Sequence, residues 1–279
     1  MSSETAIPGG VYLCQVSENV SCAACCGLYN APDGSFAGLQ KMLAERTQRF
    51  ERLPRSAEDI TDFGRQVESD QLHHRPWVDF HHCPFVGLIG DRRQRVGCLL
   101  HPLADGNKGI DYRGLSYYGG MACRQYFCPS HRDLPPEVKK IVRRLAGDWY
   151  AYGLVITETT LLGALIAEIQ NRVAATLSPS AVSDHPAFSR KLRDLLFVKI
   201  DWPFRQDNGK GLCHYFFTDR MVRREPVDYA AAGRQPVGFE TIFTELASRF
   251  QTADELLSAE RRLELLFRQA AEAFPGSLL

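Results

Sequence analysis

The spacing of apolar residues predicts a mainly helical chain. In the first half, apolar stripes predict amphipathic helices over residues 36–50 and 56–71. From Pro135 onward, helical spacing is more continuous. The clearest helix follows Thr252, which forms a capping-box pattern with Glu255 ahead of an apolar stripe. Helices should therefore supply most of the core.

The most apolar segment is predicted to be a buried helix. Residues 154–169 are rich in leucine and isoleucine, but threonine and glutamate interrupt the run. Thr157 or Thr159 can cap the helix, and a further helix is expected to begin near Pro186. Because the apolar run contains charges, it is typical of a core helix and not of a membrane span, so we expect no membrane partner.

Short apolar runs bounded by turn residues predict two hairpins. The first lies within residues 83–101 and turns at a charged segment. The second is predicted over 197–217, with the glycine-containing segment 206–211 as its turn. Residues 121–128 are expected to form one helical turn that Pro129 ends.

The character of the sequence changes near residue 134. Residues 1–134 are irregular and glycine-rich, and we interpret them as a cysteine-rich metal-binding module. Residues 135–279 are interpreted as a helical region that carries the second hairpin. The expected fold class is α+β, mainly helical, with an irregular cysteine-rich metal-bound module and short β-hairpins. The two parts can share one core.

Charge and composition narrow the class of protein. The 279 residues include 33 Lys and Arg and 33 Asp and Glu, so the net charge is zero. Neither half has the basic excess of a protein that binds nucleic acid or anionic membranes, which argues against both partners. The N-terminus has no basic segment followed by an apolar run of signal length, so a cytoplasmic location is expected.

Cysteine is the most unevenly distributed residue. Eight of the nine cysteines lie between Cys14 and Cys128. Because cytoplasmic reductants disfavour structural disulfides, such clustering indicates metal ligation or redox chemistry. A two-residue gap lets two side chains reach one ion at the ~2.3 Å of a zinc–sulfur bond. The candidate metal ligands are Cys22, Cys25, Cys26, Cys83, Cys98, Cys123, Cys128, His101 and His131.

Spacing leaves the roles of some cysteines open, and it leaves an alternative to metal binding. The adjacent Cys25 and Cys26 can serve two ions, two corners of one cluster, or one ion with a spare thiol. Cys14 lies in an apolar run and is interpreted as a core residue, and Cys213 is interpreted as structural. The alternative to metal binding is a core that uses cysteine as a small apolar residue.

The order of these motifs resembles a known family, the YkgJ-type cysteine-cluster proteins. The resemblance covers only the first half, and residues 27–82 form a longer spacer than the family pattern has. It implies a zinc- or iron-chelating cluster without implying a reaction. The residues that carry it are Cys22, Cys25, Cys26, Cys83, Cys98, Cys123 and Cys128.

Seven thiols exceed the four that one tetrahedral zinc ion requires. One zinc with spare thiols, two zincs that also use histidine, or one four-iron cluster would each account for them. His101 and His131 have ligand spacing, although surface histidines would also suit their proline-marked turns. We favour structural zinc over an iron–sulfur cluster.

Three functions from different classes follow from the sequence. We favour a binding or scaffold module with a protein partner, and the alternative is an iron–sulfur redox enzyme or electron carrier. A DNA-binding regulator is disfavoured by the neutral charge of the second half. Phosphate-binding loops, dinucleotide fingerprints and hydrolase motifs are absent from the sequence, so no catalytic residues are assigned.

Overall fold

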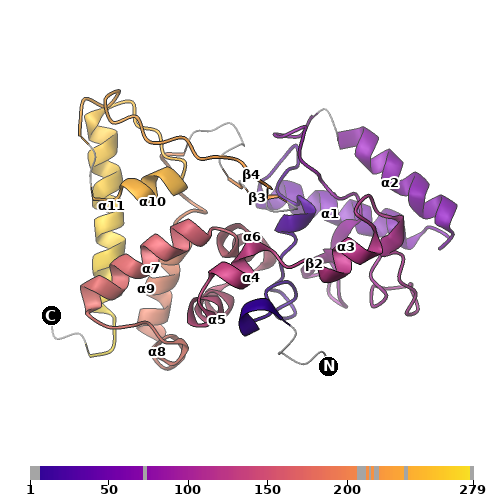
Figure 1. The fold of residues 1–279 in the computed structure, drawn as a ribbon, viewed down its shortest axis with the longest axis horizontal. Coiled ribbons are helices and arrows are strands. Elements are labelled where there is room, and N and C mark those ends of the chain that lie inside the picture. The colour runs from indigo at the N-terminus through magenta and orange to yellow at the C-terminus, as the bar shows by residue number, and fades with distance from the viewer. Residues whose placement is uncertain are drawn as a thin grey trace.

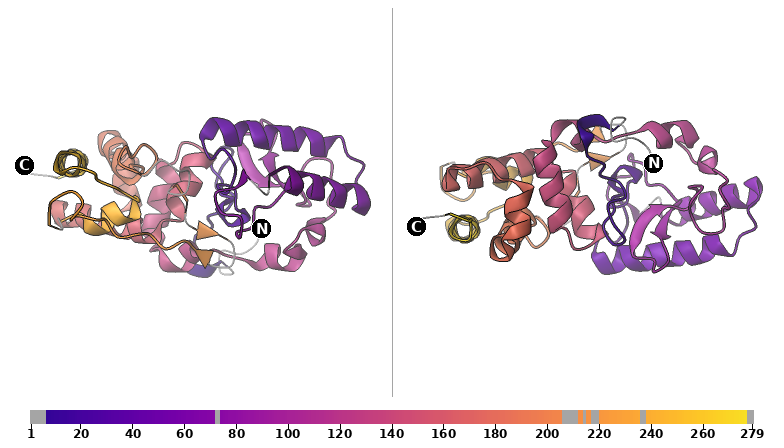
Figure 2. Two further views of the ribbon diagram at one scale, coloured as in Figure 1. Left: turned by 90° about the horizontal axis from the view of Figure 1, so that it is seen from above. Right: turned by 90° about the horizontal axis from the view of Figure 1, so that it is seen from below.

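The structure is a computed structural model that describes residues 7–71, 74–205, 212–213, 215–216, 220–235 and 238–276. These residues are mainly helical, with two small antiparallel sheets of two strands each. This confirms the predicted mainly helical α+β fold. The molecule is elongated, and its N-terminal segment lies near the middle (Figure 1, Figure 2).

The first half contains the two predicted helices and the first hairpin. Helix α1 (Phe36–Glu51) is followed by α2 (Ala57–Gln71), and the Ser56 hydroxyl accepts the Asp59 N–H at 3.1 Å. The serine therefore caps α2 and fixes where it begins. Strands β1 (Val86–Ile89) and β2 (Arg95–Cys98) then pair antiparallel as predicted.

A proline begins a helix where the sequence was expected to end one. Helix α3 (Gly119–Gln125) stops before Tyr126, and α4 (Pro129–Asp133) starts at the proline itself. Proline suits the first position of a helix because the missing N–H would have no partner there. Helix α5 (Pro136–Leu145) begins as predicted.

The most apolar segment is two helices instead of one. Helices α6 (Trp149–Ile156) and α7 (Thr159–Val173) meet at an angle of 86°. The Thr157 hydroxyl donates to the Gly153 carbonyl, and Glu158 occupies the cap position of α7 without a side-chain cap bond. Neither expected threonine caps α7. Among the described residues no single helix is long and apolar enough to cross a membrane, although this bent pair would pass by length and composition.

Four more helices lie in the described part of the second half. The Thr252 hydroxyl accepts the Glu255 N–H at 3.2 Å, which confirms the expected cap of the last helix. The α11 helix forms one end of the molecule in Figure 1, opposite α1 and α2. The four helices are α8 (Pro179–Asp184), α9 (Pro186–Leu196), α10 (Glu240–Glu245) and α11 (Ala253–Glu272).

The second hairpin pairs differently from the prediction. Strand β3 (Tyr215–Phe216) pairs with β4 (Arg220–Met221), and residues 197–204 form no strand. The reason is that Phe197 and neighbouring apolar side chains continue into the helical core directly after α9. The expected turn, 206–211, lies outside the described residues.

The two halves share their hydrophobic cores. The largest core is built from α5, α7, α9 and α11, yet it also contains Val11, Leu13 and Val20 from the N-terminal segment. A second core joins the cysteine-containing segment to Trp149 and Leu154 of α6. A third core lies between α1, α2 and the first hairpin. The N-terminal segment thus lies beside residues from both halves, which brings its cysteines next to distant parts of the chain.

Candidate metal centre

A short 3₁₀ helix, η3 (Ala24–Cys26), holds the adjacent cysteines. Its end is set by Gly27, which has a φ of +73°. A Cβ at this glycine would lie 2.0 Å from the carbonyl oxygen of His81, so the backbones approach as closely as glycine allows. The Cys83 N–H donates to the Cys26 carbonyl at 2.8 Å. The start of the first hairpin is therefore attached to the end of η3.

Cys14 and Cys22 lie beside each other across a tight antiparallel bend. The Cys22 N–H donates to the Cys14 carbonyl at 2.8 Å, next to a bridge between Gln15 and Ser21. The His131 ring connects Cys128 to the backbone next to Cys14. The Leu13 N–H donates to Nε2 of His131 at 3.2 Å, and Nδ1 of the same ring lies 3.4 Å from the Cys128 sulfur.

Cys83, Cys98 and Cys123 gather at the base of the first hairpin. Val86 stands opposite Cys98 in the β1–β2 pairing, so Cys83, just before β1, lies near the end of β2. Helix α3 then brings in Cys123, whose sulfur lies 3.9 Å from the hydroxyl oxygen of Ser116. The hairpin thus brings the backbone of Cys83 beside that of Cys98, as the sequence predicted, and the charge of Cys123 acts on both thiols.

Burial and mutual repulsion govern the chemistry of these thiols. Burial, together with the charge of a neighbouring cysteine, raises the pKa of Cys98 and of Cys128 to about 11. Burial likewise raises the pKa of Cys14, Cys22 and Cys83, again with a contribution from neighbouring cysteines. Without a cation these thiols stay protonated at neutral pH. A bound metal ion would remove their protons.

Backbone amides point at several of the sulfurs. The Ala24 N–H donates to the sulfur of Cys22 at 3.5 Å. Amides two or three residues along the chain also favour the thiolates of Cys83, Cys98 and Cys128, and they lower the pKa that burial raises. An N–H bonded to sulfur stabilises the charged thiolate, which is the form that binds metal.

The histidines have partners that decide their roles. Because Nε2 of His131 accepts a backbone N–H, its proton is on Nδ1, which faces the Cys128 sulfur. This geometry favours a hydrogen bond to a sulfur ligand over direct ligation by His131. Nδ1 of His101 accepts the Leu103 N–H at 3.1 Å and leaves only Nε2 for a metal. His82 instead receives a hydrogen bond from Arg46 at 2.7 Å, so it has a structural role.

Buried cations stand near the thiols. The Arg46 guanidinium donates to the Cys83 carbonyl at 3.3 Å. The fully enclosed Lys139 ammonium group donates to the Gly9 carbonyl at 2.9 Å and to the His131 carbonyl at 2.7 Å. Burial lowers the pKa of this lysine, and the negative charge of nearby Cys128 raises it. These cations would offset part of the negative charge of buried thiolates.

Two cysteines outside the predicted ligand set take different positions. Cys213 is buried, and its thiol donates to the Tyr215 carbonyl at 3.5 Å, as suits a structural residue. Cys14, which the sequence suggested as a core residue, lies next to Cys22 and within reach of Cys128. No short motif marks Cys14 in the sequence, so its place in the cluster depends on the fold.

The donor set fits zinc or an iron–sulfur cluster. All nine cysteines are free, and thiolates are the preferred ligands of both. In the ranges that the structure describes, no three His, Cys, Asp or Glu side chains already stand as a ready ligand set for one ion.

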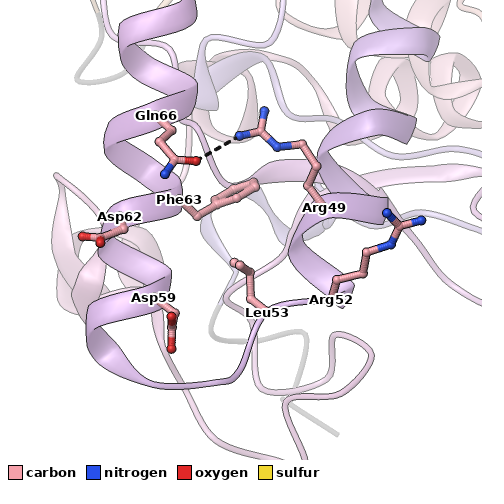
Figure 3. Close-up of a pocket in the computed structure, with 7 residues that line it drawn as sticks. All are labelled: Arg49, Arg52, Leu53, Asp59, Asp62, Phe63 and Gln66. Carbon is pink, nitrogen blue, oxygen red and sulfur yellow. Dashed lines mark hydrogen bonds between the residues drawn. The ribbon is translucent and has the colours of Figure 1, made fainter.

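A surface pocket of about 350 Å³ lies elsewhere, between the end of α1 and the start of α2 (Figure 3). In it, Arg49 donates to the Gln66 side chain at 3.3 Å. Its mixed acidic and basic lining includes no cysteine, so it does not belong to the metal centre. The residues that line it are Arg49, Arg52, Leu53, Asp59, Asp62, Phe63 and Gln66.

Comparisons with known proteins identify no relative. No family model matches the chain, and no significant match was found among curated proteins or solved structures. The resemblance to YkgJ-type proteins therefore stays a prediction.

Proposed function

We propose that this protein binds metal through its cysteine cluster, with structural zinc favoured, and acts as a binding or scaffold module. The observation that carries the proposal is that backbone hydrogen bonds join cysteine-bearing segments that are distant in the chain, and that amides beside several of the sulfurs stabilise thiolates. Zinc is bound by such sets of thiolates in structural sites. A reducing compartment such as the cytoplasm would keep the thiols available.

A cysteine-rich apolar core explains the arrangement less well. A buried neutral thiol packs as a small apolar group and needs neither amide donors nor a cation. Around Cys128, by contrast, the sulfur has His131 within 3.4 Å and the positive charge of Lys139 nearby. Donors and cations placed around a sulfur favour a charged ligand.

A structural metal would also suit the small cores of the first half. The cores beside the cysteines are less extensive than the helical core, and they reach the surface at several half-buried thiols. Binding of structural zinc contributes about 10–16 kcal/mol in zinc-finger peptides at neutral pH. A bound metal ion would therefore contribute directly to the folding stability of the first half.

One feature favours an iron–sulfur cluster as the second candidate. The hydroxyls of Tyr126 and Tyr215 are hydrogen-bonded to each other, and both Cys25 and Cys128 act electrostatically on Tyr215. Tyr12 adds a third ring beside Cys14. Such rings would shield a cluster from water, and solvent exposure is one of the factors that set its redox potential.

The test is elemental analysis of anaerobically purified protein together with its visible spectrum. We expect stoichiometric zinc and no colour. Iron with acid-labile sulfide would replace the scaffold function by the redox candidate. The matched control is Cys213→Ser, which should retain the metal of the wild type. Protein that folds with all thiols titratable and without bound metal would overturn the proposal.

A further inference from the structure

We infer that this protein binds a phosphate group at two buried arginine side chains, Arg46 of α1 and Arg75, where the chain leads from α2 to the first hairpin. The phosphate is either free or part of a nucleoside monophosphate. Guanidinium nitrogens that are buried without an acceptor point to this ligand. No thiol takes part, so phosphate binding goes beyond the proposed metal binding and does not depend on it.

One edge of the Arg75 guanidinium is buried without a partner. Arg75 is 6% exposed, and neither its Nε nor its Nη2 has a hydrogen-bond partner. These two nitrogens form an edge that can donate to two oxygens at once. Arg113 uses the same edge in this way, since its Nε and Nη2 donate to the two carboxylate oxygens of Asp111 at 2.9 and 2.7 Å. The Arg75 edge therefore lacks an acceptor that presents two oxygens.

Arg46 adds a second buried cation, and its hydrogen-bond partners are neutral. It is 2% exposed, and its two Nη atoms donate to the Cys83 carbonyl, the Gln71 side-chain carbonyl and the His82 ring. Its Nε has no hydrogen-bond partner. Burial, together with the positive charge of Arg75, lowers the pKa of Arg46 to about 10. The two guanidinium groups therefore repel each other inside the protein.

The carboxylates of α2 form no ion pairs with these arginines. Glu68 acts on Arg75 electrostatically, but Glu68 is exposed. Asp70 lies 3.8 Å from Arg49 instead. Throughout the ranges that the structure describes, neither Arg46 nor Arg75 has a carboxylate at ion-pair distance. Two buried cations without a paired anion suit a dianion, and the planar guanidinium edge matches the spacing of phosphate oxygens.

The chain that follows Arg75 has a fixed backbone. The fully buried Asn30 side chain donates to the carbonyls of Trp77 and Phe80 at 2.8 and 2.9 Å. Its Oδ1 accepts the Trp77 N–H at 3.0 Å. Because these bonds hold the backbone beside Arg75, an anion loses less affinity to the ordering of its site.

Phosphate has to enter through a local opening, because the unpartnered Arg75 nitrogens are enclosed. Residues 75–76 belong to no helix or strand, and they precede the part of the chain that Asn30 holds. Their movement therefore breaks no helical hydrogen bond. The cost of opening lowers the apparent phosphate affinity in proportion to the fraction of open protein.

An exposed aromatic ring near the site distinguishes the two sources of phosphate. The charge of Arg75 acts on His81, and the His81 ring stacks on Tyr117 with the ring centroids 5.7 Å apart. Tyr117 is 85% exposed, so it offers a face on which a nucleobase can stack. A nucleoside monophosphate would use the arginines and this ring, whereas free phosphate would use the arginines alone.

The experiment is isothermal titration calorimetry on the full-length protein in phosphate-free buffer, with inorganic phosphate and adenosine monophosphate as the two probes. We expect one phosphate site per chain. Arg75→Gln should weaken binding about 10- to 100-fold, because it removes two charge-assisted hydrogen bonds. The matched control is Arg65→Gln, since Arg65 is an exposed arginine of α2 that pairs with Asp62. This control should retain the wild-type affinity.

Tyr117→Ala separates the two sources. If the ligand is a nucleoside monophosphate, this variant should bind adenosine monophosphate about fivefold or more weakly and should bind inorganic phosphate as the wild type does. Equal affinities for the two probes, unchanged in Tyr117→Ala, would identify free phosphate as the ligand.

Arg75→Lys keeps the test decisive if Arg75→Gln fails to fold. It retains the positive charge and removes the two-nitrogen edge, so it should bind phosphate about tenfold more weakly than the wild type. Wild-type protein that binds neither probe at about 10 mM would overturn the inference. Wild-type affinity in a folded Arg75→Gln or Arg75→Lys variant would also overturn it. Zinc content measured on the same samples tests the proposed metal binding separately.

Discussion

Replacement of Gly27 by alanine tests whether the contact between η3 and the first hairpin positions metal ligands. Gly27 has a φ of +73°, and its missing Cβ leaves room for the His81 carbonyl. Gly10 is a matched control because it has a φ of +71° and no atom lies within 4 Å of the position that a Cβ would take. Both alanine variants carry the same backbone penalty, so only Gly27→Ala adds a collision.

The expected losses of stability and of metal affinity follow from the surroundings of Gly10 and Gly27. A left-handed conformation costs an ordinary residue about 1–2 kcal/mol, so both variants should lose that amount of stability. In Gly27→Ala the new carbon would also lie 2.0 Å from the His81 oxygen, which is far inside contact distance. The backbones must separate by about 1 Å, whereas a metal site tolerates displacements of about 0.5 Å. Since Cys83 is bonded to Cys26 across this contact, metal affinity should fall about 10- to 100-fold.

The assay is competition for zinc with a chromophoric chelator, run beside urea unfolding of each variant. We expect Gly10→Ala to retain wild-type zinc affinity and to lose only the backbone contribution to stability. Gly27→Ala should lose zinc to the chelator at a much lower chelator concentration. Equal zinc affinity in the two variants would refute the reasoning that this contact holds the ligands in place.

Three further predictions concern charge, protons and capping. Glu158→Gln should destabilise the protein by about 3–5 kcal/mol in urea unfolding, because it leaves the buried Lys199 ammonium without its carboxylate partner. The control Glu264→Gln removes an exposed ion pair and should cost under about 1 kcal/mol. Similar losses of stability in the two variants would contradict the account. Zinc binding to metal-free protein at pH 7 should release about three to four protons per ion and should strengthen as pH rises, because burial holds the pKa of thiols such as Cys98 near 11. Calorimetry in buffers of different ionisation enthalpy measures the number of protons released. Release of less than one proton per ion would count against buried thiols as ligands. Thr252→Ala should cost about 1 kcal/mol in the same urea assay by removing the cap of α11, and an unchanged midpoint would show that the cap is dispensable.

The sequence predicted those elements whose formation depends on residues close together in the chain. The helices α1, α2 and α11 have apolar stripes and capping residues within a few positions, and each is present as predicted. The first hairpin also follows from two apolar runs around a charged turn. The predictions were wrong where packing decides, as at Pro129, at the α6–α7 bend and in the second hairpin.

The candidate site shows the same limit. Spacing identified Cys22, Cys25 and Cys26 as a ligand motif, because those residues are close in the chain. It interpreted Cys14 as a core residue, and only the fold shows that its backbone is hydrogen-bonded to Cys22 and lies beside the distant His131. Spacing also made His131 a ligand candidate. Only the fold shows that Nε2 of His131 accepts the Leu13 N–H.

X-ray absorption spectroscopy at the metal edge of purified protein tests the central claim most directly. If cysteine thiolates hold the metal, the first shell of a zinc-loaded sample should contain about four sulfur atoms at about 2.3 Å and no imidazole scattering. A first shell with two or more nitrogen or oxygen ligands at about 2.0–2.1 Å would contradict the account.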